Sequence, residues 1–207
     1  YILDRFLGGS SNYQKTGSLD SGFYLSAVKV SENKTITPPQ YILDEIEKND
    51  GDISFTRDSA QWLGEFDYTF MAGWMYAVNN WFPNYGMSDY KPGDGERGLK
   101  DGDVIRIQYT LYGYGMDIGG GYGGEGEGEG TFQGSYIPLA NRDALSAAVA
   151  AINSAQDKET ILENAMVKAA YDYAVSILED LTATQKYVDD ALALLNLAQG
   201  DKTALVK

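Results

Sequence analysis

The spacing of apolar and polar positions predicts strands and short helices in the first two thirds of the chain. Alternating runs typical of strands occur at 22–30 and 103–112. The second run predicts one packed face and one solvent-facing face, formed by Ile105, Ile107, Tyr109 and Leu111 against Val104, Arg106, Gln108 and Thr110. Helical spacing predicts helices at 1–7, ended by Gly8-Gly9, and at 41–48. Because the chain opens directly on a helix at Tyr1, we expect a further strand before it.

A change of composition near Pro138 predicts two domains, 1–137 and 138–207, in an α+β protein. The second part is rich in alanine and leucine, and its short connections predict a small antiparallel three-helix bundle. Asn141 or Asp143 caps the first helix, whose buried stripe is Leu145, Val149 and Ile152. The second spans 158–180, with interior positions Ile161, Leu162, Ala165, Val167, Ala169, Tyr173, Ile177 and Leu178. The third spans 184–198, with Val188, Ala191, Leu192 and Leu195 as its stripe.

Residues 119–130 form a low-complexity segment in which glycines alternate with carboxylates. Glycine entropy and charge repulsion both oppose folding of such a segment. We therefore interpret it as a solvated hairpin tip rather than a cation site, because a glycine chain does not hold carboxylates in a preset cage.

Charge and composition exclude several classes of function. Thirty acidic and sixteen basic residues give a formal net charge of −14, which repels nucleic acid. The chain has no cysteine and no histidine, which excludes disulfides, zinc sites built on sulfur or imidazole, and catalytic triads with an imidazole base. No apolar stretch is long enough to insert into a membrane as a helix. No carboxylate pair stands out as a glycosidase pair would, so we expect no enzyme.

Residues 73–90 (GWMYAVNNWFPNYGMSDY) show a Gly-Trp-hydrophobic-Tyr-x-hydrophobic-Asn core and a proline-containing loop, and residues 99–105 (LKDGDVI) show a Lys-Asp-Gly-Asp turn before a strand. With these motifs, the two segments resemble the transcobalamin-like C-terminal domain family. The resemblance implies a β-grasp-like module with a mixed sheet over residues 1–137. Residues 183–195 (ATQKYVDDALALL) resemble the FIVAR helical repeat of Gram-positive surface proteins. Together they imply a secreted bacterial protein of the cell surface or cell wall, with further modules in the same polypeptide.

An aromatic concentration in the resembling segment is the candidate ligand-binding site: Trp74, Tyr76, Asn79, Trp81, Phe82, Asn84, Tyr85 and Tyr90. Its rings suit a planar or sugar-like ligand, which the two asparagines would orient. The alternation of Trp74, Tyr76 and Val78 favours core packing for the first two rings. For Trp81, Phe82 and Tyr85 both interpretations stay open. We expect no cofactor, and cobalamin is an alternative ligand that only the family analogy implies. The candidate partners are a small molecule, a glycan or a surface protein.

A second cluster, Asp94, Glu96, Asp101 and Asp103, is a weak candidate for calcium. Its spacing does not follow the EF-hand loop, and Asp-Gly pairs are strong turn signals, so turn formation is the preferred interpretation. We thus expect a non-enzymatic surface module that binds a partner through its aromatic loop, with the helical part as a spacer. The alternative is a purely structural segment of a multidomain surface protein.

Overall fold

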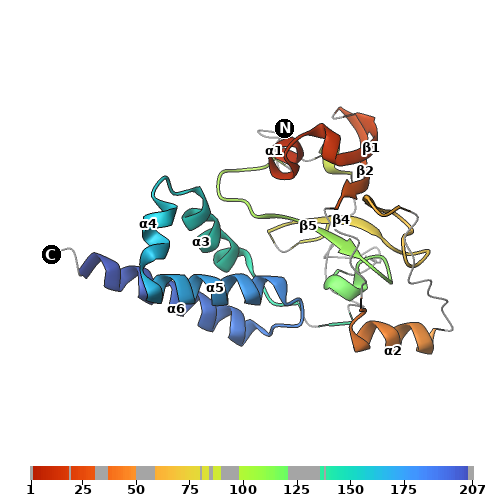
Figure 1. The fold of residues 1–207 in the computed structure, drawn as a ribbon. Coiled ribbons are helices and arrows are strands. Elements are labelled where there is room, and N and C mark those ends of the chain that lie inside the picture. Colours follow the sequence, from red (N-terminus) through yellow and green to blue (C-terminus); the bar gives the residue numbers. More distant parts are fainter. Residues whose placement is uncertain are drawn as a thin grey trace. The chain divides into compact units, whose positions relative to one another are not determined.

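The structure is a computed structural model that describes residues 2–18, 20–30, 37–49, 59–79, 81–83, 86–89, 98–120, 136–137 and 139–204. Helices and antiparallel sheets confirm the α+β class (Figure 1). The chain separates into two compact units, residues 1–137 and 138–207. None of the helices in the described ranges is long and apolar enough to cross a membrane.

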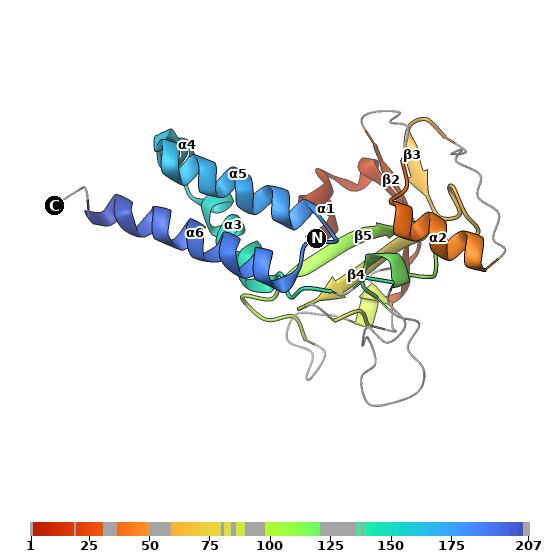
Figure 2. The ribbon, with the colours of Figure 1, turned by 90° about the horizontal axis from the view of Figure 1, so that it is seen from below.

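The N-terminal unit contains two antiparallel sheets. The first has the order β1-β2-β3, formed by Tyr13–Ser18, Ser21–Lys29 and Trp62–Gly64. The second pairs β4, Gly73–Val78, with β5, Ile105–Thr110, which lie side by side in Figures 1 and 2. All pairings among the described strands are antiparallel, so the mixed β-grasp-like sheet stays a prediction.

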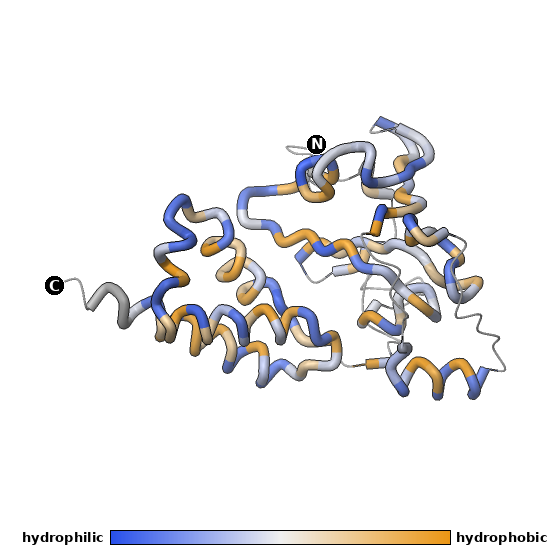
Figure 3. The backbone as a smooth tube through the Cα atoms, viewed as in Figure 1, coloured by the Kyte–Doolittle hydropathy of each residue, from blue (hydrophilic) through white to orange (hydrophobic). Residues whose placement is uncertain are grey.

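Two short helices lie in the same unit where the sequence predicts them. Helix α1 spans Ile2–Leu7 and packs Leu3 and Leu7 against a core of β1 and β2 side chains. Helix α2 spans Gln40–Lys48 and begins after Pro39, whose fixed φ suits a helix start. In Figure 3 its tube alternates between orange and blue. The buried Ile42 and Ile46 form its apolar face, four residues apart.

The two-sided pattern predicted for β5 is wrong. Residues 105–109 are all half-buried, and Thr110, placed on the solvent side by the pattern, is buried. The reason is local, because the Thr110 hydroxyl donates to the buried carboxylate of Asp117 and accepts from the backbone N–H of Gly115. Polar groups that are hydrogen-bonded in this way tolerate burial.

The helical unit contains α3 (Asp143–Ser154), α4 (Lys158–Glu163), α5 (Ala165–Glu179) and α6 (Gln185–Ala204). Its core includes the predicted Leu145, Val149, Ile152, Ile177, Val188, Ala191 and Leu195. The single helix predicted over 158–180 is wrong, because the chain breaks at Asn164. The Asn164 side chain accepts from the backbone N–H groups of Met166 and Val167 and so caps a new helix. Ala165 and Ala169, predicted to lie inside, are exposed.

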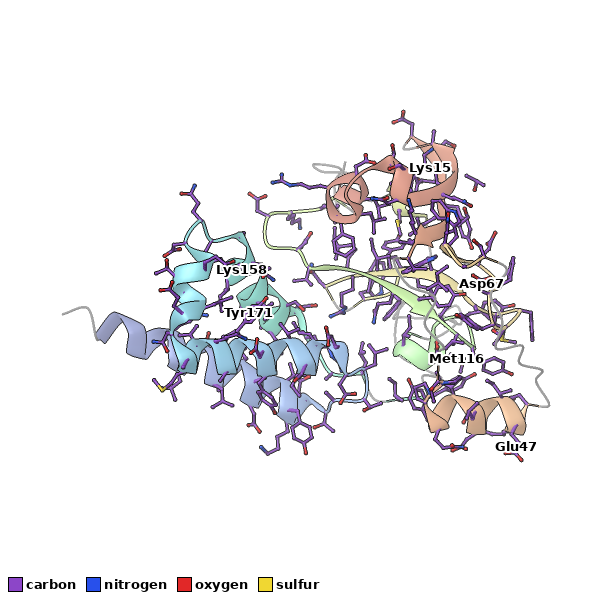
Figure 4. All side chains as sticks on the ribbon, viewed as in Figure 1. Lys15, Glu47, Asp67, Met116, Lys158 and Tyr171 are labelled. Carbon is purple, nitrogen blue, oxygen red and sulfur yellow. The ribbon has the colours of Figure 1, made fainter. Side chains whose placement is uncertain are left out.

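A small polar cluster joins α3, α4 and α5. The Asn153 side-chain oxygen accepts from Lys158 Nζ at 2.7 Å and from the Tyr171 hydroxyl at 2.8 Å. The Lys158 ammonium also lies 5.8 Å from the centre of the Tyr171 ring (Figure 4). Such cation–π contacts are weak at exposed sites, so the cluster orients α4 more than it stabilises the unit.

The start of the helical unit is fastened to the corner between α5 and α6. The buried Arg142 guanidinium donates to the backbone carbonyls of Ala140, Asp180 and Ala183. Beside it the Gln185 side chain accepts from the Asn141 backbone N–H and donates to the Asn141 carbonyl. The N-cap of α3 is Arg142 and not the predicted Asn141 or Asp143, although the Asn141 side chain accepts from the Asp143 backbone N–H just before the helix.

We predict that Arg142→Met destabilises the helical unit by about 1–3 kcal/mol, because the buried carbonyl of Ala183 and the partly buried carbonyl of Asp180 lose a donor. Urea unfolding followed by far-ultraviolet circular dichroism measures the loss. The matched control is Lys168→Met, which removes an exposed pair with Asp172 and should change stability by less than about 0.5 kcal/mol. Equal losses in the two variants would contradict the fastening role.

Candidate functional site

Trp74 and Tyr76, the first two predicted site residues, are half-buried on β4. The Trp74 indole N–H donates to the Leu63 carbonyl at 2.8 Å, and its ring meets the Tyr109 ring edge-on at a centroid distance of 5.3 Å. Trp74 also packs against the core cluster of β1 and β2. It therefore joins the two sheets, as its alternation predicts.

Asn79 and Asp103 form a turn at one end of the β4–β5 sheet. The Asn79 side chain donates to the Asp103 carboxylate at 2.6 Å and accepts from the backbone N–H of Val104. The second carboxylate oxygen of Asp103 accepts from the Lys100 backbone N–H. The hydrogen bond from Asn79 and, to a smaller extent, that from the Lys100 backbone lower the pKa of Asp103. Both side chains are thus engaged in the turn rather than directed at a ligand.

The predicted aromatic loop is only partly described. Trp81 forms an isolated antiparallel bridge with Val78 through two backbone hydrogen bonds and is half-buried, and Phe82 is buried. Asn84, Tyr85 and Tyr90 lie outside the described residues, as do Asp94 and Glu96 of the calcium candidate and most of the 119–130 segment. Asp101 is exposed in the turn beside Asp103. Over the described ranges, no three acidic side chains gather in a way that could hold a metal ion.

Two loops that carry exposed aromatic rings lie at the opposite end of the β4–β5 sheet, where Gly73 pairs with Thr110. Loop 65–72 enters β4 there, and loop 111–120 leaves β5 there. These loops carry three exposed rings, Phe66 (63%), Phe70 (58%) and Tyr114 (47%). Figure 4 labels one side chain from each loop, Asp67 from loop 65–72 and Met116 from loop 111–120. We call the three rings and their two loops the aromatic end.

Loop 65–72 is closed by buried polar groups. The Phe66 backbone N–H donates to the Ala72 carbonyl at 2.8 Å, and the Asp67 carboxylate accepts from the Gly64 backbone N–H at 2.7 Å. Asp67, Tyr68 and Thr69 are buried between the two exposed phenylalanines. Phe66 and Tyr68 have φ of 64° and 75°, a left-handed conformation that side chains with a Cβ rarely adopt. The loop therefore turns Phe66 and Phe70 outward at a cost in backbone strain.

Loop 111–120 is built around the carboxylate of Asp117, which is 1% exposed. This carboxylate accepts from the Thr110 hydroxyl and from the backbone N–H groups of Leu111 and Tyr112. Burial raises the pKa of Asp117, and the hydrogen bonds oppose that rise. The enclosed turn holds three successive left-handed residues, Gly113, Tyr114 and Gly115, with φ of 77°, 52° and 97°. Tyr114 is thus presented by a strained backbone.

Glycine is required on both sides of Tyr114. A Cβ at residue 113 would lie 2.5 Å from the Tyr136 hydroxyl, and one at residue 115 would lie 2.5 Å from Met75 Sδ. A Cβ at either position would displace the end of one of these side chains, and the left-handed φ of both residues favours glycine.

Hydrogen bonds tie the two loops to each other and to α2. The Thr69 hydroxyl donates to the Leu111 carbonyl, which joins loop 65–72 to loop 111–120. The Tyr109 hydroxyl contacts the carbonyls of Gly64 and Asp67 at 2.7 and 2.9 Å. The Tyr41 hydroxyl of α2 donates to the Asp117 carbonyl at 2.9 Å. A connected network of hydrogen bonds therefore supports the two loops of the aromatic end.

No protein-family model matches the chain, and the searches of curated proteins and of solved structures found no match either. The candidate site is therefore argued from its geometry.

Sequence reasoning missed the aromatic end. The alternation of Phe66, Tyr68 and Phe70 imitates a strand face, and neither glycine nor proline interrupts residues 65–72 to indicate a loop. A usable signal was present in the Gly113-Tyr114-Gly115 sequence, because glycines on both sides of a large ring are typical of a tight turn that exposes it.

Tyr24 of β2 borders loop 65–72. Its hydroxyl donates to the Glu65 carboxylate at 2.6 Å, and the Glu65 backbone N–H donates to the Ser26 carbonyl. Burial, together with this carboxylate, raises the pKa of Tyr24 to about 12. Glu65 is therefore held by β2 immediately before Phe66.

We predict that Asp117→Asn destabilises the N-terminal unit by about 1–3 kcal/mol, because an amide cannot accept from all three donors and turns its own N–H₂ toward one of them. Urea unfolding followed by tryptophan fluorescence reports on this unit, which holds all three tryptophans. The control, Asp101→Asn in an exposed turn, should stay within about 0.5 kcal/mol of the wild type. An unchanged stability of Asp117→Asn would contradict the role of this carboxylate.

A pH dependence follows from Tyr24. Its folded-state pKa of about 12 lies above the ordinary value of 10.0, so its contribution to stability is complete below pH 10 and is lost as the pH rises toward 12. We therefore expect the stability advantage of the wild type over Tyr24→Phe to shrink across this range in urea unfolding. Tyr187→Phe, at an exposed tyrosine of α6, serves as the control. An advantage that stays constant to pH 12 would show that the Tyr24–Glu65 contact does not contribute.

Proposed function

We propose that residues 1–137 form a non-enzymatic binding module of a bacterial cell-surface protein, and that the module binds a protein partner through its aromatic end. The observation that carries the proposal is the exposure of Phe66, Phe70 and Tyr114 on strained, hydrogen-bonded loops at one end of the β4–β5 sheet. The helical unit serves as a spacer to further modules. The resemblance of residues 73–90, 99–105 and 183–195 to the two families supports the proposed surface location.

Strain supports a binding role. A non-glycine residue with a left-handed φ costs of the order of 1–3 kcal/mol and persists where the surrounding structure enforces it. Here the strain at Phe66 and Tyr114 leaves large rings in water instead of burying them. A partner that covers these rings would recover the apolar area that folding leaves exposed.

The chemistry of the rings favours a protein over a sugar. Phenylalanine rings offer no hydrogen-bonding group, whereas sugar sites need polar groups that orient the hydroxyls. Aromatic rings on a rigid support are typical anchors of protein interfaces. The loops are fixed from beneath by Tyr109 and Thr69, so little conformational freedom is lost on binding.

The carboxylates of the aromatic end support a non-enzymatic role. Asp67 and Asp117 are buried and accept hydrogen bonds from the backbone, and Glu65 accepts from Tyr24. A general acid or base needs a carboxyl group within reach of the substrate proton. These three groups are instead used to build the loops.

The test is a binding screen with the double variant Phe66→Ala/Phe70→Ala. The wild-type chain is immobilised and screened against extracellular proteins, glycans, peptidoglycan fragments and corrinoids. We expect a protein to bind, and the double variant to weaken it by at least about tenfold, because truncation of two anchor rings typically costs more than 1 kcal/mol each. Phe6→Ala, which removes an equally exposed ring from α1, should bind as the wild type does.

Other outcomes of the screen separate the alternatives. A saturable ligand whose binding is lost in Trp81→Ala but kept in the double variant would place the site in the 81–90 loop instead. Binding of a corrinoid would replace the protein partner with the cofactor implied by the family resemblance. Silence across the whole panel would favour a purely structural segment.

A further inference from the structure

Acidic residues outnumber basic ones around the aromatic end. No lysine or arginine occurs between Trp62 and Val78 or between Ile107 and Gly120. Of the acidic residues in these stretches, Glu65 is half-buried, whereas Asp67 and Asp117 are buried within the loops. Helix α2 borders both loops, because Ile42 and Ile46 pack with Tyr68, Leu111 and Tyr112. This helix adds Asp44, Glu45 and Glu47 and a single basic residue, Lys48, which pairs with Glu45 at 3.3 Å.

The electrostatics at Tyr136 agree with this excess of negative charge. The Tyr136 ring stacks on Tyr112 at a centroid distance of 6.4 Å, directly before the Gly113–Gly115 turn. Burial raises the pKa of Tyr136, and the charges of Tyr112, Glu45 and Asp117 raise it further. Carboxylates of α2 and of loop 111–120 therefore act on the same side chain.

From this combination of exposed apolar rings with the carboxylates of Glu65 and helix α2, we infer that the partner presents a basic, apolar segment to the aromatic end. The inference rests on the proposed function and specifies its partner. Arginine is the side chain that fits best, because its guanidinium stacks on aromatic faces and pairs with carboxylates at the same time. Apolar side chains beside it would cover Phe66 and Phe70. An acidic or neutral segment would meet the same rings without charge complementarity.

The experiment uses the full chain and three synthetic peptides of about ten residues. The first alternates arginine with leucine, the second has glutamate in place of arginine, and the third has serine in place of leucine. We expect measurable binding of the arginine–leucine peptide alone, weakened several-fold when salt rises from about 0.05 M to about 0.5 M. Phe66→Ala/Phe70→Ala should weaken it by at least about tenfold.

A charge variant tests the carboxylates separately from the rings. Glu65→Gln keeps an oxygen that accepts from Tyr24 and removes one negative charge beside Phe66. We expect a loss of affinity of roughly two- to fivefold and a weaker salt dependence. Phe6→Ala should bind the arginine–leucine peptide as the wild type does, because it removes a ring outside the aromatic end. Phe66→Ala/Phe70→Ala keeps the net charge of −14, so a loss of binding in that variant excludes attraction to the overall charge as the cause.

The inference is overturned if the arginine–leucine peptide fails to bind, if the glutamate–leucine peptide binds equally well, or if binding is the same in the double phenylalanine variant. Its failure differs from that of the proposed function. Suppose that the screen finds a neutral or acidic protein whose binding depends on Phe66 and Phe70. That result would contradict the inference of a basic partner and would support the proposed binding module. A protein whose binding is unchanged in Phe66→Ala/Phe70→Ala would contradict the proposed site as well as the basic partner.

Discussion

A buried carboxylate must be compensated by hydrogen-bond donors, and in the N-terminal unit that requirement falls on Asp117. Its donors are the hydroxyl of Thr110 and two successive backbone N–H groups, so the chain after β5 must curl around the carboxylate. That path places the Leu111 carbonyl against Thr69, which in turn positions loop 65–72. The geometry of both loops thus follows from the burial of a single charge.

The sequence predicts where most helices and strands lie better than it predicts which of their residues are buried and where a helix breaks. Local signals are sufficient for α1, for α2 after Pro39 and for the helical stripes of α3 and α6, because spacing and caps lie within a few residues. The burial of Thr110 depends on a carboxylate seven residues away, which no periodicity indicates. The break at Asn164 is a competition between capping and helix continuation, and the amide side chain decides it only once both helices are packed.

The candidate site was harder to predict than the fold for a related reason. Aromatic spacing identified Trp74, which turned out to join the two sheets, and it gave no weight to Phe66. The left-handed φ does not by itself separate buried from exposed rings, because the buried Tyr68 shares it with the exposed Phe66 and Tyr114. Their exposure is imposed by hydrogen bonds from distant segments, which a pattern of residue types does not contain.

The contacts of Arg142 have a consequence for mechanical load. Tension that reaches the helical unit through Ala140 meets Arg142 and Asn141, which are bonded directly to Asp180, Ala183 and Gln185. The force therefore passes across this junction into α6 and bypasses α3, α4 and α5. Several hydrogen bonds must break together before those three helices are stretched, so a pulled chain would keep them folded until the junction itself gives way.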